Sequence, residues 1–147
     1  MRKSWESGFT LVELLLSMAM IGIVAGASLP VYFSFYNRND VSLTTETIAS
    51  MFRRAQNYAR SVQGDSQWGV HIQAGSATLF KGATYAARDT AYDETAVINT
   101  SITPTGTTDV LFAKLSGAPG STASVTLTGQ ANETRTIIVN AKGTVSY

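Results

Sequence analysis

The chain has 147 residues, and 44% of them are hydrophobic. It contains no cysteine, which excludes a disulfide framework, a thiolate zinc site and a cysteine nucleophile. The formal net charge of +1 gives no strong general attraction for nucleic acid. We therefore expect one domain of ordinary size, stabilised by packing alone, together with an anchoring segment.

Residues 9–29 form an almost unbroken apolar run that follows a short basic leader. At 1.5 Å per residue, a helix of about 21 residues is roughly 30 Å long, which matches the hydrocarbon thickness of a bilayer. The run contains one acidic residue, Glu13. A carboxylate in such a segment costs about 2.5–3.5 kcal/mol on insertion scales, so we expect Glu13 to have a partner or a function.

The leader ends at Gly8, and Phe9-Thr10-Leu11-Val12-Glu13-Leu14 follows. This stretch resembles the prepilin motif of the type IV filament superfamily, which includes type IV pilins and type II secretion pseudopilins. The resemblance implies that a prepilin peptidase cleaves between Gly8 and Phe9 and methylates the new N-terminal Phe9. It also implies that Glu13 pairs with the terminal amine of a neighbouring subunit, and that Pro30 kinks the helix. Such pairing is physically reasonable because two charges that leave water together lower each other's desolvation cost.

A secretory signal or a plain signal anchor would also begin with basic residues, here Arg2 and Lys3, before an apolar core. The run here is longer than the usual core of about 7–15 residues, and its early glutamate favours the prepilin interpretation. We therefore divide the chain into a leader (1–8), a transmembrane and filament-core helix (9–30) and a soluble domain (31–147). Cleavage would remove two basic residues and one acidic residue from 11 and 10, leaving nine of each.

A second helical pattern follows the apolar run and extends to about Val62. Apolar residues recur at steps of three and four, which predicts an amphipathic helix that ends at Gly64-Asp65. The predicted buried stripe is Ile48, Met51, Phe52, Ala55, Tyr58, Ala59 and Val62, with Arg53, Arg54, Gln56 and Arg60 mostly off that face.

From Ser66 onward the period changes to two, which predicts about six short antiparallel strands. Residues 68–72 and 77–81 form a predicted hairpin. A looser region, residues 82–106, surrounds Val97-Ile98. Asn140–Gly143 is predicted to form a tight turn, in which Gly143 tolerates a positive φ. The remaining strands are expected at 110–113, 124–128, 136–140 and 144–147.

The fold class is therefore α+β. A long N-terminal helix, transmembrane in its first half and amphipathic in its second, packs on a C-terminal antiparallel β domain of one sheet or two small sheets, a pilin-like arrangement. The helix end, the strand at Leu111-Phe112 and the closing hairpin resemble the GspH/FimT group of minor pseudopilins and pilins. Some FimT-like members bind DNA through basic residues near the C-terminus. Gly143-Thr144-Val145-Ser146-Tyr147 lacks them, so this property is not carried over.

The residue inventory offers little chemistry. The chain has one histidine, His71, which alternates with buried strand positions and is expected to be solvated or hydrogen-bonded rather than catalytic. Asp89, Asp93 and Glu94 could chelate calcium through hard oxygen ligands, or simply form a solvated acidic loop. We expect no enzyme activity, catalytic residue, metal or cofactor.

The sequence thus predicts a minor pilin or pseudopilin, a structural subunit of a type II secretion pseudopilus or a type IV pilus. Its partners would be other pilins through the N-terminal helix, the prepilin peptidase, and membrane lipid before assembly. The protein would be a single-pass inner-membrane protein with its C-terminal domain exported. The alternative is a DNA-binding FimT-like minor pilin that acts in natural transformation.

Overall fold

The computed structural model of the chain describes residues 8–130 and 132–147, with the backbone alone over residues 27–38. The chain divides into two units, one that ends at Tyr36 and one that runs from Asn37 to Tyr147. The helix α1, Leu11–Arg60, contributes to both units.

The end of α1 differs from the prediction. The helix ends at Arg60 rather than near Val62, and a 3-10 turn, Gln63–Asp65, follows. Val62 itself adopts the left-handed conformation (φ 55°, ψ 33°), which is unusual for a β-branched residue. The Trp68 indole donates a hydrogen bond to the Gln63 carbonyl (2.8 Å), so a buried aromatic side chain fixes this turn against the domain.

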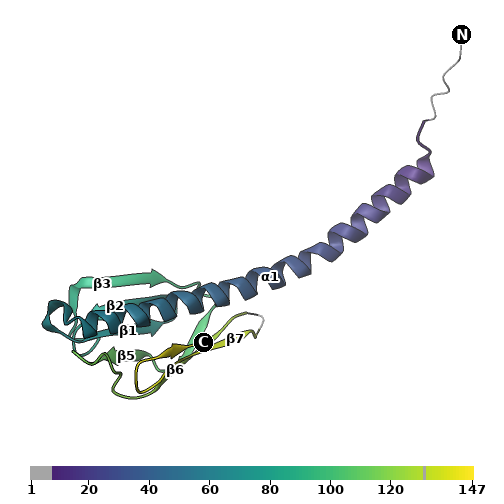
Figure 1. The fold of residues 1–147 in the computed structure, drawn as a ribbon. Coiled ribbons are helices and arrows are strands. Elements are labelled where there is room, and N and C mark those ends of the chain that lie inside the picture. The colour runs from purple at the N-terminus through teal and green to yellow at the C-terminus, as the bar shows by residue number, and fades with distance from the viewer. Residues whose placement is uncertain (1–7, 131) are drawn as a thin grey trace, which may run out of the picture. The chain divides into compact units, whose positions relative to one another are not determined.

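In the described residues, eight strands follow α1 and form two antiparallel sheets of four strands each. Figure 1 shows these strands beside the second half of α1. The first sheet has the order β3-β2-β1-β5, and the second has the order β4-β6-β7-β8. The bounds are β1 Trp68–Gln73, β2 Ser76–Lys81, β3 Asp89–Val97, β4 Thr103–Gly106, β5 Asp109–Phe112, β6 Ala123–Thr128, β7 Thr134–Val139 and β8 Val145–Ser146.

The prediction of about six strands missed β3 and β4 as separate strands. β3 is an edge strand of nine residues, and most of its side chains are exposed, so it lacks the apolar alternation that marks a half-buried strand. β4 is also an edge strand and contains Pro104, a residue that weakens a strand prediction. About half of the looser region of the sequence is therefore paired backbone, and the two-sheet alternative is correct.

One face of α1 forms the core together with both sheets. Ile48, Met51, Phe52, Ala55 and Ala59 are buried as predicted, whereas Tyr58 and Val62 are only half-buried. The Phe52 and Phe112 rings pack edge to face with their centroids 6.4 Å apart. The sheet residues that share this core are Trp68, Val70, Ile72, Ala77, Leu79, Val110, Phe112, Ala123, Val125, Leu127, Ile137 and Val139.

Gln56 was expected off the buried face, and this expectation is wrong. Its side chain is only 9% exposed, and its Nε2 donates to the carbonyl oxygens of Gly117 (2.9 Å) and Lys142 (3.4 Å). A buried carboxamide without partners would be costly, so these two hydrogen bonds explain its position. Gln56 thereby ties α1 to two turns that are distant in the sequence.

The turn between β7 and β8 depends on a glycine. Gly143 has a φ of +83°, as its place in the sequence predicted, and the Asn140 side chain accepts hydrogen bonds from the N–H groups of Lys142 and Thr144. A Cβ at position 143 would lie 1.9 Å from Gln56 Nε2 and 2.8 Å from the Gly117 carbonyl oxygen. The turn can approach α1 this closely because residue 143 has no side chain.

The described residues contain no helix that is both long and apolar enough to cross a bilayer. The membrane-spanning first half of the helix stays a prediction.

We expect Gly143→Ala to destabilise the domain by about 2–4 kcal/mol, because it combines a left-handed backbone with a clash against Gln56. Gly120→Ala is the matched control, since a Cβ there meets nothing within 4 Å, and it should change stability by less than about 0.5 kcal/mol. Denaturant unfolding of the full chain in neutral detergent, followed by circular dichroism, measures both. Equal stability of the two variants would contradict the close approach.

Candidate functional site

The start of α1 contains the residues that the sequence singled out. Residues 8–10 are not helical, so the predicted cleavage bond between Gly8 and Phe9 precedes the first helical residue, Leu11. Both residues are exposed: a Cβ on Gly8 would meet nothing within 4 Å, and Phe9 is 80% exposed. This geometry leaves the bond accessible to another protein, while cleavage and methylation stay predictions.

Thr10 caps the helix, a role that the sequence analysis missed. Its Oγ1 accepts a hydrogen bond from the Glu13 N–H (3.3 Å), and its carbonyl accepts one from the Leu14 N–H (3.1 Å). Thr10 and Glu13 have the spacing of a capping box, in which a threonine at the cap is followed three residues later by a glutamate. That spacing is visible in the sequence and could have revealed the helix start.

Glu13 lies in the first turn of α1, where its carboxylate is exposed. A negative charge at this end of a helix interacts favourably with the unpaired N–H groups and the positive end of the helix dipole. Glu13 therefore has a local electrostatic role before any partner is considered. A chain terminus of another subunit would add a second positive charge at the same end.

The side chains after Glu13 are apolar on every side of the helix. Consecutive helical positions are about 100° apart, so Leu14, Leu15 and Leu16 point to three different sides, and each is more than half exposed. The same holds further along α1 for Met18, Met20, Ile21, Ile23 and Val24. A helix that is apolar all round requires a covering of lipid or of other helices.

The predicted kink at Pro30 concerns a side chain that lies outside the described residues. It stays a prediction, as does the pairing of Glu13 with a neighbouring amine.

Comparison with known proteins adds two findings. The prokaryotic N-terminal methylation motif matches residues 6–29. The structure of the minor pseudopilin EpsH from the Type 2 Secretion System of Vibrio cholerae is similar to this chain with a TM-score of 0.55 and 9% sequence identity. The match covers 73% of this chain and 94% of that one. Among curated proteins, no sequence gives a significant match.

This motif and this fold both agree with the resemblance to the type IV filament superfamily that the sequence predicted. The fold is similar to that of a minor pseudopilin, as the sequence predicted. An N-terminal helix packed on antiparallel sheets is the arrangement that this chain shares with the pseudopilin EpsH.

The other residues considered from the sequence are separated in this fold. Asp89, Asp93 and Glu94 each lie against a different cation, namely Lys81, Arg88 and Arg54. No group of three possible metal ligands gathers anywhere in the described residues. His71 lies on the outer face of the first sheet, where its Nδ1 is 2.8 Å from Asp109 Oδ1 and its ring stacks on Tyr85. This is the hydrogen-bonded strand histidine that the sequence predicted.

We expect Thr10→Ala to loosen the first turn of α1, because removal of a helix cap costs about 0.5–2 kcal/mol. Thr10→Ser is the matched control, since it keeps the hydroxyl that accepts from the Glu13 N–H. Amide hydrogen exchange of Glu13, measured on the full chain in detergent, should become several times faster in Thr10→Ala only. Unchanged exchange in both variants would show that Thr10 does not cap the helix.

Proposed function

We propose that this protein is a minor pilin or pseudopilin, a non-enzymatic subunit of a type II secretion pseudopilus or a type IV pilus. The observation that carries the proposal is the exposed apolar surface around the whole first part of α1, which lies within the residues that the methylation motif matches. This surface has to be covered by something outside the chain. In a filament, the same helices of neighbouring subunits supply that cover.

The N-terminal segment would act in three steps. Before processing, the basic leader and the apolar helix anchor the protein in the inner membrane with its C-terminal domain exported. A prepilin peptidase then cleaves after Gly8 and methylates Phe9. Finally, the helix leaves the lipid and packs among the helices of other pilins, where the exposed Leu14–Val24 surface becomes buried.

The charge of Glu13 would matter in the last step. Two charges that enter a low-dielectric environment lose their hydration, and pairing offsets part of this cost. The cleaved chain provides an amine at Phe9, only four residues before Glu13. The Phe9 amine of one subunit can therefore reach the Glu13 carboxylate of a neighbour when the two helices are only slightly offset along their axes. The pair would therefore favour one register between adjacent helices.

The folded unit would then be the part that distinguishes this subunit from others. Its chemistry supports an interaction domain: its charged side chains mostly pair with one another, and its single histidine is hydrogen-bonded to Asp109. We infer that the domain contributes to filament assembly, and thereby to protein secretion or pilus function, by contacting neighbouring subunits.

The test is the N-terminus of the protein in a cell that contains a prepilin peptidase. Intact-mass analysis of the membrane fraction should find a chain that starts at Phe9, heavier by one methyl group. Gly8→Val should leave an inserted but uncut precursor, because the peptidase has to approach the backbone closely at a residue without a side chain. Gly22→Val is the matched control and should be processed normally. A mature chain that starts at another residue would contradict the proposal.

A further inference from the structure

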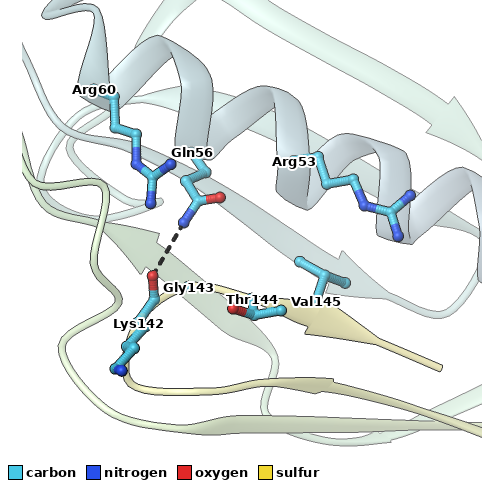
Figure 2. Close-up of a pocket in the computed structure, with 7 residues that line it drawn as sticks. All are labelled: Arg53, Gln56, Arg60, Lys142, Gly143, Thr144 and Val145. Atoms are coloured by element: carbon cyan, nitrogen blue, oxygen red, sulfur yellow. Dashed lines mark hydrogen bonds between the residues drawn. The ribbon is translucent and has the colours of Figure 1, made fainter.

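A pocket between α1 and the β7–β8 turn is lined by basic residues from distant parts of the chain (Figure 2). It has a volume of about 270 Å³. α1 contributes Arg53, Gln56 and Arg60, and residues 142–145 form the opposite side. We call it the α1–β8 pocket. Because Gln56 and Gly143 hold the turn against the helix, the pocket is built into the fold.

In the part of the domain that the structure describes, most other cations form an ion pair with a carboxylate, whereas those of this pocket do not. Arg54 lies against Glu94, and hydrogen bonds to Tyr58 and Glu94 raise its pKa. Lys114 lies against Asp65 and lowers the pKa of that carboxyl. Within the described residues, Arg53, Arg60 and Lys142 form no ion pair with a carboxylate.

The contacts that the pocket cations do make leave most of their donors available. Arg53 lies over the Tyr147 ring, 5.5 Å from its centroid, and Arg60 Nε donates to the Ser116 carbonyl (3.2 Å). A guanidinium has five N–H donors in a planar fork that matches a carboxylate or a phosphate. Positive charges that line one pocket repel one another, and an anion in the pocket would relieve that repulsion.

The surroundings of the pocket favour a peptide over a nucleic acid. Glu46, Arg53 and Arg60 are spaced by seven residues, so they lie along one side of α1. Glu46 lines an adjacent pocket together with Arg135 and Tyr147, and Tyr147 also lies beneath Arg53. A continuous phosphate backbone that followed this line would meet the Glu46 carboxylate. A peptide of mixed charge can instead place its acidic residues at the pocket and a basic residue at Glu46.

We propose that the α1–β8 pocket binds a carboxylate-bearing segment of a neighbouring filament subunit. This inference rests on the proposed function, which places the exported domain among other subunits. The Arg53 and Arg60 guanidinium groups bind the carboxylates, Lys142 on the turn adds positive charge, and Glu46 selects against uniformly negative partners. The contact would add specificity between folded domains to the less selective apolar packing of the N-terminal helices.

The first test measures binding of a fluorescein-labelled hexapeptide of glutamate to the full chain in neutral detergent, by fluorescence anisotropy. The glutamate peptide should bind in a salt-sensitive manner, and a glutamine hexapeptide should not. Arg53→Gln combined with Lys142→Gln should weaken binding at least tenfold. Arg54→Gln combined with Lys114→Gln removes the same charges outside the pocket and should change binding less than twofold.

Three results would overturn the inference: no binding of the glutamate peptide, an equal loss in both double variants, or tighter binding of a double-stranded oligonucleotide through the same residues. Glu46→Gln distinguishes the partners further. It should strengthen oligonucleotide binding at a nucleic-acid site, but at the site proposed here it should weaken binding of a glutamate peptide that ends in lysine, because that lysine would lose its carboxylate partner.

The second test is carried out in cells and separates this inference from the proposed function. Because the chain has no cysteine, a photoreactive label can be attached to Thr144→Cys in the pocket or to Leu16→Cys on the apolar helix. Both should cross-link to other pilin subunits, and Arg53→Gln with Lys142→Gln should abolish only the cross-link from position 144. A cross-link from position 16 alone would refute the pocket, whereas none from either position would refute the filament role as well.

Discussion

The burial of one face of α1 is the constraint on which the folded unit depends. Phe52, Ala55 and Ala59 are fully buried, and residues of both sheets pack in the same core. Neither four-stranded sheet has another layer of helix in the described residues, so α1 is the element against which both bury their apolar faces. After Gly106, the chain passes from the second sheet to the first in two residues. A Cβ at position 106 would lie 2.3 Å from the Ser124 carbonyl oxygen. Gln56 adds hydrogen bonds to this packing, since its side chain donates to carbonyl oxygens of two turns that lie against the helix.

The sequence predicted those parts of the fold in which burial leaves a periodic signal. The stripe from Ile48 to Ala59 and the hairpin of β1 and β2 were correct because their buried residues recur with the period of a helix or a strand. β3 was missed because an exposed edge strand has no such period, and Gln56 because a glutamine gives no sign in the sequence of the carbonyls it will meet. The helix end was misplaced because Val62 adopts a conformation that its residue type disfavours.

Of the candidate sites, the linear motif at the start of α1 could be predicted from the sequence, whereas the pocket could not. Gly8, Phe9 and Glu13 were found from a linear motif, and the cap at Thr10 could have been found in the same way. The α1–β8 pocket could not, because it joins Arg53 to Lys142 across nearly ninety residues of sequence and depends on the tertiary approach of a turn to a helix. Arg53 and Arg54 are adjacent in sequence, yet one lines this pocket and the other pairs with Glu94, a difference that appears only in three dimensions.

The central claim is that the start of α1 is an assembly element in which the Glu13 charge meets the amine of a neighbouring subunit. The most direct measurement compares co-assembly of wild type, Glu13→Gln and Glu13→Ala with other pilins, by cross-linking in cells at matched expression. Thr10→Ala serves as the control, because it removes the cap but keeps the charge. The account predicts that both Glu13 variants are cleaved normally yet fail to co-assemble, since an unpaired buried amine carries a penalty of several kcal/mol, while Thr10→Ala still assembles. Normal co-assembly of Glu13→Gln would contradict the paired-charge mechanism.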